Sequence, residues 1–134
     1  MAGSKSNYLE NALLDHALGG PDYVRPANIW IALYLEAPND AGGGLEVSGG
    51  SYYRPQLPND LSTWAAAIGG SKTNLVEVVF PLTSAAWGLV VAYAIHDDPV
   101  AGNMLYWGEF DDPPTVGIGS TAKFVNGALT VQED

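Results

Sequence analysis

The chain has 134 residues, 47% hydrophobic and 15% charged, which supplies enough apolar side chains for one compact domain and argues against disorder. Its 15 acidic and 5 basic residues give a formal charge of −10, so direct nucleic-acid binding, which needs clustered Lys and Arg, is not expected. Cys is absent, which excludes disulfides, thiolate nucleophiles and Cys-ligated metals.

The N-terminal segment does not have the pattern of a targeting or membrane sequence. Residues 1–20 place acids and a His inside the apolar stretch, and the longest apolar runs elsewhere are about as long as one strand. We therefore expect a single domain over residues 1–134 that is made in the cytoplasm and has no membrane partner. Residues 1–7 are small and polar, and we expect them to form an arm that lies on a neighbouring subunit.

Residues 8–18 have the pattern of an amphipathic helix. Asn7 followed three residues later by Glu10 is a variant of the capping box. Two glycines and a proline at residues 19–21 have the usual chemistry of a helix C-terminus. The apolar face that we expect to be buried consists of Leu9, Leu13, Leu14, Ala17 and Leu18.

From residue 28 the hydrophobic period changes from that of a helix to that of a strand. Apolar residues at 29, 31, 33 and 35 alternate with side chains that point the other way, which predicts a half-buried strand over Asn28–Glu36. Turn clusters without helical patterns separate the later strands, so we predict an all-β fold over residues 28–132, an antiparallel β-sandwich or jelly roll of about seven to eight strands. The later strands are predicted at 51–57, 75–80, 89–96, 104–110, 121–125 and 128–132, with a short one at 45–48.

Two local signals refine the strand prediction. Pro55 lies inside the predicted strand 51–57, and because proline cannot donate a ladder hydrogen bond, this strand is expected at an edge or a bulge. Asn126-Gly127 has the chemistry of a two-residue hairpin turn, which would pair the strands on either side, and a corner of a jelly roll is the alternative use of the same glycine.

No catalytic site assembles from the motifs. His16 and His96 lack a nucleophile elbow, and we interpret His16 as a residue of the helix surface. Asp97-Asp98 and Asp111-Asp112 each precede a proline and are interpreted as turn residues, with a calcium site or a pair of glycosidase carboxylates as alternatives. The segment 69–73, GGSKT, fails the P-loop pattern because Ser separates Gly from Lys. We predict no enzyme activity, no cofactor and no metal.

Aromatic residues on or beside the predicted strands are the candidate binding residues. Such side chains can fill a core, anchor a subunit interface or stack against a sugar. We assign them to core or interface packing and keep carbohydrate binding as the alternative. The candidate interface residues are Trp30, Tyr34, Tyr52, Tyr53 and Trp107.

Several phrases of the sequence resemble a known family when taken in order. The opening SNYLENALLDHALGG is followed by IWIALYLEAPNDAGGGLEVSGGSYYRP, by Trp64 and GGSKTN, by VVFPLTSAAWG, by NMLYWGEF and by a closing ALTV. Together they resemble a family of small tailed-bacteriophage virion proteins commonly described as phage tail-fibre proteins, from Ser6 to Val131. The resemblance implies a structural protein of the virion and supplies no catalytic residues.

Within a virion, the small size of the chain favours an external capsid decoration, or cement, protein that stabilises the shell. The alternative is a tail-fibre or tail-tip component that binds a host receptor or surface glycan. Expected partners are further copies of the chain, as a homotrimer or a dimer, and other virion proteins such as the major capsid protein or tail proteins. Residues 37–50 are rich in glycine, and we expect a partner to order them. A third reading, a glycan depolymerase, would use Asp97, Asp98, Asp111 or Asp112.

Overall fold

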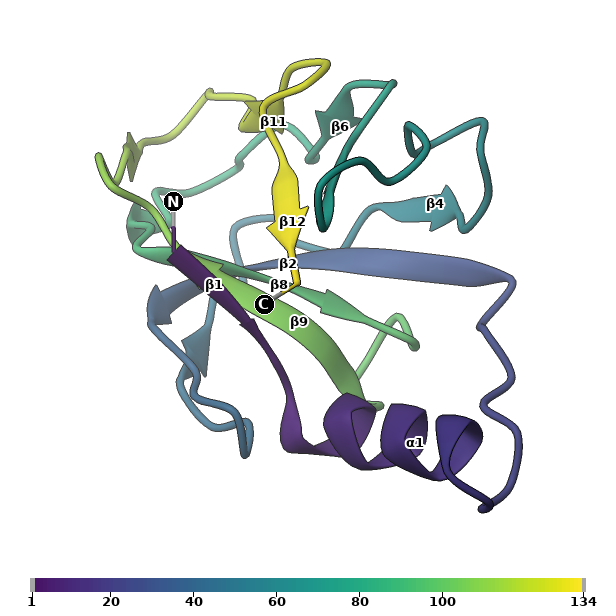
Figure 1. Cartoon of the computed structure of the whole chain (residues 1–134). Coiled ribbons are helices and arrows are strands. Elements are labelled where there is room, and N and C mark those ends of the chain that lie inside the picture. The colour runs from purple at the N-terminus through teal and green to yellow at the C-terminus, as the bar shows by residue number, and fades with distance from the viewer. Residues whose placement is uncertain (1, 134) are drawn as a thin grey trace.

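The computed structural model describes residues 2–133, which form one helix and twelve short strands (Figure 1). Met1 and Asp134, the ends of the predicted domain, lie outside the described residues. One sheet crosses the middle of the molecule, α1 lies at one end of it, and small ribbons lie above it in the view of Figure 1. The elements are β1 (Ala2–Lys5), α1 (Asn7–Ala17), β2 (Asn28–Glu36), β3 (Leu45–Glu46), β4 (Gln56–Pro58), β5 (Ser71–Thr73), β6 (Val78–Val79), β7 (Gly88–Leu89), β8 (Ala92–His96), β9 (Met104–Glu109), β10 (Thr115–Val116), β11 (Lys123–Phe124) and β12 (Thr130–Gln132).

β2 organises the central sheet, and the predicted strand over 28–36 is confirmed. One edge of β2 pairs with β8, and its other edge pairs with β4 near the start and with β3 near the end. β8 also pairs with β9, and β9 pairs with β1, so the strand order is β1-β9-β8-β2-β3 with every pair antiparallel. The sheet therefore places the N-terminal strand β1 next to β9, a strand from the last third of the chain.

Each face of the central sheet has its own hydrophobic core, because successive side chains of β2 point to opposite faces. Ile29, Ile31 and Leu33 join the larger core, which also contains apolar residues of the ribbons β5–β12, β6–β11 and β7–β10. Ala32 and Tyr34 join a smaller core on the other face, with small side chains of β8. The sheet is thus buried on both faces along much of β2 and β8.

The N-cap of α1 differs from the prediction. Ser6, not Asn7, holds the cap: its Oγ accepts a hydrogen bond from the backbone N–H of Leu9 at 3.1 Å. The backbone N–H of Ser6 also donates to the carbonyl of Leu105 at 2.9 Å. This bond to β9 holds Ser6 directly after β1, which ends at Lys5. The helix therefore begins at Asn7 and not at Tyr8.

The helix is confirmed, but most of its predicted apolar face is not buried. Leu9 is buried and Leu13 is half-buried against the larger core. Leu14 and Leu18 are 58% and 79% exposed, and Ala17 is exposed as well. Only the first two turns of α1 therefore pack onto the sheet.

Three strands form from segments that carry no alternation of polar and apolar residues. Ala2–Lys5, expected within a polar arm over residues 1–7, is β1, because it pairs with four residues of β9. Ser71–Thr73 and Thr115–Val116 form strands by pairing with β12 and β7. Long-range partners, not local sequence, decide these elements.

The predicted strand over 51–57 is shorter than expected and lies at an edge. Only Gln56–Pro58 pairs, with the first residues of β2. Pro55 directly precedes it, and its carbonyl accepts a hydrogen bond from Ile31 N–H at 3.1 Å. The expectation of an edge strand at this proline is confirmed.

Asn126-Gly127 makes a tight turn but not a hairpin. The N–H of Ala128 donates to the carbonyl of Val125 at 3.0 Å, and Gly127 has a φ of +81° that favours glycine. The strands on either side pair elsewhere, β11 with β6 and β12 with β5, so the predicted hairpin pairing was wrong.

The all-β class with antiparallel pairing and one N-terminal helix is confirmed. Outside the central sheet, the described strands form three separate two-stranded ribbons, and this pairing does not establish the second sheet of a sandwich or the topology of a jelly roll. Among residues 2–133, no helix has the length and apolarity needed to span a membrane.

Candidate functional site

A buried ion pair lies beside the edge of β2. Arg54 donates from Nε and Nη2 to the two carboxylate oxygens of Glu46, at 2.8 Å each. Its Nη1 donates to the carbonyls of Asp98 and Ala101 at 2.9 and 3.0 Å. Hydrogen bonds and the positive charge of Arg54 outweigh burial and lower the pKa of Glu46. The pair holds the loop after β8 against the segment that precedes β4.

Tyr52 extends this network into the larger core. Its hydroxyl donates to Glu46 Oε2 at 2.7 Å and accepts from Leu33 N–H at 3.0 Å. Its ring contacts Trp87 edge-on, with centroids 5.2 Å apart, and Phe80. Burial, and then the hydrogen bond to Glu46, raise the pKa of the Tyr52 hydroxyl.

Tyr34 and His96 meet on the opposite face of the sheet. The Tyr34 hydroxyl and His96 Nε2 are 2.9 Å apart in a hydrogen bond, and the rings are stacked with centroids 6.3 Å apart. Burial, and then the nearby charge of Arg54, lower the pKa of His96 to about 4. Burial, and then the charge of Glu46, raise the pKa of Tyr34 to about 12. Both side chains are therefore neutral near pH 7.

The structure does not bring the five predicted interface aromatics to one surface. Tyr34 is 5% exposed and Tyr52 is half-buried in the core, whereas Tyr53 is 63% exposed. Trp30 and Trp107 are half-buried, and the indole of Trp107 donates to Asp40 Oδ1 at 2.8 Å. Tyr34 and Trp107 do pack around the same smaller core. A role for these five residues in subunit contact stays a prediction.

The acidic pairs and the exposed His have local roles where their contacts are known. Asp97 accepts from the backbone and side chain of Asn103 at 2.7 and 3.0 Å, and Asp98 accepts from Val100 N–H at 3.1 Å, as turn residues do. His16 accepts from Tyr23 N–H at 3.1 Å, after the end of α1. Across residues 2–133, no group of three or more His, Asp or Glu side chains is placed to hold a metal.

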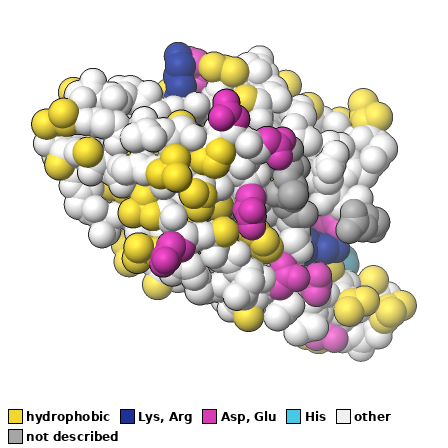
Figure 2. Space-filling view, turned by 90° about the vertical axis from the view of Figure 1, so that its left-hand side faces the viewer, with side chains coloured by type: hydrophobic (Ala, Val, Ile, Leu, Met, Phe, Trp, Pro, Cys, Tyr) yellow, Lys and Arg dark blue, Asp and Glu magenta, His cyan; other side chains and the backbone are white. Residues whose placement is uncertain are grey.

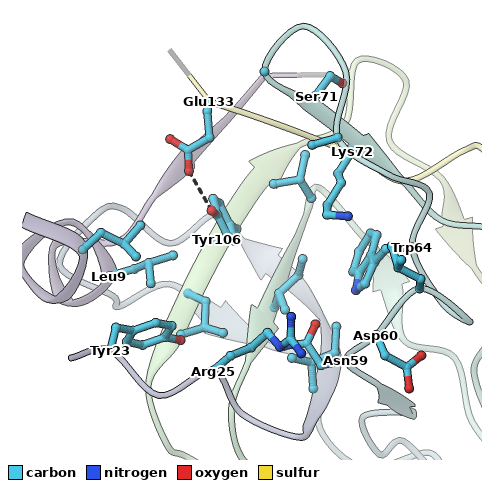
Figure 3. A pocket seen from close by; sticks show the side chains of 18 residues that line it. Leu9, Tyr23, Arg25, Asn59, Asp60, Trp64, Ser71, Lys72, Tyr106 and Glu133 are labelled. Atoms are coloured by element: carbon cyan, nitrogen blue, oxygen red, sulfur yellow. Dashed lines mark hydrogen bonds between the residues drawn. The ribbon is translucent and has the colours of Figure 1, made fainter. Parts of the chain in front are cut away.

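A pocket of about 330 Å³ lies on the larger-core face of the sheet, where the ribbons leave it uncovered (Figure 3). Ile29, Ile95 and Leu105, from three neighbouring strands, form its floor. Leu9 and Leu13 of α1 close one side, and the loop between β4 and β5 closes the other. Aliphatic side chains therefore form the floor and one side of the pocket, and aromatic and polar side chains complete its wall.

Charged and polar side chains stand around the mouth of this pocket. Glu133 accepts from the Tyr106 hydroxyl at 2.7 Å and forms an ion pair with Lys5 at 2.6 Å. Asp60 accepts hydrogen bonds from Ser62, and these bonds lower its pKa. Both acids at the mouth thus already have donors.

The basic groups and the indole of the pocket are less fully engaged. Lys72 donates a single hydrogen bond, to the carbonyl of Ala65 at 2.7 Å. Arg25 makes no hydrogen bond or salt bridge with the described residues, although its charge adds to the Ser62 hydrogen bonds in lowering the pKa of Asp60. The indole N–H of Trp64 makes no hydrogen bond with the described residues. Figure 3 shows the three nitrogen-bearing groups extending toward the pocket from different segments. The pocket therefore contains N–H groups of Arg25, Lys72 and Trp64 that can still donate hydrogen bonds.

The pocket was not predicted from the sequence. Arg25 and Trp64 lie in irregular segments without a motif, and Lys72 lies in β5, which was expected to be a turn. Two of the five basic residues of a chain with charge −10 line one pocket, but only the folded chain brings them together. The small number of basic residues was the one feature of the sequence that could have drawn attention to Arg25 and Lys72.

The comparisons with known proteins define the class as a phage fibre protein. A family model described as Podophage GP4 fiber I protein gp80 matches residues 4–132. The chain belongs to this family, and it is a fibre-type structural protein of a phage virion. The match favours the fibre alternative over capsid decoration, which its small size had favoured. Among curated proteins, none matches the chain.

Proposed function

We propose that the chain is a compact module of a tail fibre that joins other virion proteins by contact and performs no chemistry of its own. The observation that carries the proposal is the family match, which spans nearly the whole described chain. The geometry supports it, because the buried Arg54 and the half-buried Glu46 and Tyr52 use their hydrogen bonds to hold loops and strands. A packed module of this kind suits a part that transmits force.

Exposed apolar side chains near α1 support contact with a neighbour. Leu14, Leu18 and Val24 are 58%, 79% and 83% exposed on the helix and the segment that follows it. Such side chains are common anchors of protein interfaces when they lie together. A homotrimer is the first arrangement to test and a dimer the second, since fibres attach around symmetry axes.

Immunogold electron microscopy of the parent phage tests the fibre assignment. Antibody raised against the purified chain should label the tail and its fibres, with heads unlabelled. Pre-immune serum on the same grids is the control. Dense label over the head surface would overturn the fibre assignment in favour of capsid decoration.

A further inference from the structure

The pocket between α1 and the β4–β5 loop, called here the pocket beneath α1, has acids that are already hydrogen-bonded and donors that are not. This difference indicates what it binds. Its acids, Asp60 and Glu133, already accept hydrogen bonds, whereas Arg25 and the indole of Trp64 donate none to the described residues. Arg25 acts on Asp60 only through its charge. Lys72 has donated only one of its three N–H groups. The unsatisfied groups of the pocket are therefore donors, and two of them are cationic.

The indole N–H of Trp64 is available to a ligand. It makes no hydrogen bond with the described residues and is not a buried atom, so it can donate to an acceptor that enters the pocket. A carboxylate is the acceptor that also matches Arg25 and Lys72 in charge. The pocket differs in charge from the rest of the chain. The formal charge of the chain is −10, and Figure 2 shows acidic side chains, with few basic ones, across another face. A carboxylate would be repelled by that face and attracted by Arg25 and Lys72.

The body of the pocket selects an aliphatic group. Leu9, Leu13, Ile29, Ile95 and Leu105 line it, and its volume of about 330 Å³ suits a few side chains of a peptide. A sugar would need an open aromatic face for stacking, but Trp64 is buried and the other two aromatic residues of the lining, Tyr23 and Tyr106, are half-buried. The lining therefore favours an apolar side chain over a glycan.

We propose that this pocket docks a segment of another virion protein in which an aliphatic side chain lies next to an Asp or Glu. The aliphatic side chain fills the space over β2, β8 and β9. The carboxylate receives hydrogen bonds from Arg25, Lys72 and the indole N–H of Trp64. This inference rests on the proposed fibre function for the identity of the partner as a virion protein.

Titration of the isotope-labelled protein with blocked peptides, followed by NMR, tests the docking. The probe is the acetylated, amidated peptide Gly-Leu-Asp-Gly, compared with Gly-Leu-Asn-Gly, which lacks the charge, and Gly-Ala-Asp-Gly, which lacks the aliphatic group. The Leu-Asp peptide should shift the indole signal of Trp64 and bind at least about 5-fold more tightly than either control. Equal binding of the three peptides would overturn the proposal.

A matched pair of variants assigns the carboxylate to its partner. Arg25→Gln should weaken the Leu-Asp peptide about 10-fold and the Leu-Asn peptide less than about 2-fold, because only the former has a charge to lose. Lys123→Gln makes the same charge change away from the pocket, where Lys123 pairs with Glu77, and should leave both affinities unchanged. An equal effect of both variants would show a general charge effect and would contradict the proposal.

Further probes decide between occupants. If glucuronate or decanoate shifts the Trp64 signal while the Leu-Asp peptide does not, a sugar acid or a lipid is the occupant and the proposal is wrong. If the signal shifts with protein concentration alone, the occupant is a second copy and a separate partner is excluded. None of these results depends on where the protein lies in the virion, so failure here leaves the fibre assignment to its own test.

Discussion

At the scale of single residues, two buried residues that can carry a charge, Arg54 and His96, have large expected effects on stability. Arg54 is 8% exposed and spends its donors on Glu46 and on two carbonyls of the loop after β8. His96 is 6% exposed and is kept neutral by burial. Both residues stabilise the fold only while their protonation states and partners are retained.

Removal of Arg54 should destabilise the chain strongly. Arg54→Met leaves the carboxylate of Glu46 without its cation and the carbonyls of Asp98 and Ala101 without a donor, and we expect a loss of about 3 kcal/mol in the free energy of unfolding. Urea denaturation followed by tryptophan fluorescence measures it. Arg25→Met is the matched control, since Arg25 is exposed and makes no hydrogen bond or salt bridge with the described residues, and the unfolding free energy of this variant should stay within about 0.5 kcal/mol of the parent.

His96 should make the fold sensitive to mild acid. Its pKa is about 4 in the folded chain against 6.5 as the ordinary value, so the unfolded chain takes up the proton first as the pH falls. Its contribution is complete above pH 6.5 and declines between pH 6.5 and 4, with about 2 kcal/mol lost by pH 5.

Urea unfolding at pH 7, 6 and 5 measures this loss. His96→Gln should flatten the pH dependence over that window, whereas His16→Gln, at an exposed position, should retain it. An unchanged slope in His96→Gln would assign the acid sensitivity to other groups.

At the scale of elements, the ends of strands and helices are fixed by a few hydrogen bonds with distant segments. Asn74 is fully buried after β5, and its side chain donates to the carbonyls of Val76 and Val125 and accepts from Leu129 N–H. It thereby connects the β5–β12 ribbon to the β6–β11 ribbon. Ser6 has the corresponding role between β1 and α1.

The N-cap prediction separates the observed cap from the one expected from sequence. Ser6→Ala removes the acceptor for Leu9 N–H and should cost about 1 kcal/mol in the free energy of unfolding. Asn7→Ala, at the predicted cap, should change it by less than about 0.5 kcal/mol. The reverse order in chemical denaturation would restore Asn7 as the cap.

Loss of the Asn74 side chain should loosen two ribbons together. Asn74→Ala removes the side-chain partner of the buried Leu129 N–H and of the part-buried carbonyls of Val76 and Val125, and we expect a loss of about 3 kcal/mol in the free energy of unfolding. Hydrogen exchange should show faster exchange at both Leu129 and the residues of β6. Asn11→Ala on the exposed surface of α1 is the control, and a similar loss there would refute the role given to Asn74.

The sequence predicts elements where a pattern is local and fails where a partner is distant. β2 could be predicted because its alternation reflects two buried faces, and α1 because its spacing is regular. β1, β5 and β10 are too short and too polar to show a pattern, and their partners lie many residues away. The pocket could not be predicted for the same reason, since Arg25, Trp64 and Lys72 meet only through tertiary structure.

At the scale of the whole molecule, the chain is a small, acidic module with two cores, an open pocket beside α1 and exposed apolar side chains on the helix. The family match over residues 4–132 makes it a fibre-type virion protein. We propose that this packed module joins longer virion proteins by contact and that it lies on the tail.

Cryo-electron microscopy of the intact virion tests that claim most directly. We predict that the central sheet and α1 fit density at the tail and its fibres, with an ordered segment of another protein over the pocket beneath α1. A fit of the same fold to the outer surface of the capsid, with no matching density on the tail, would contradict the account.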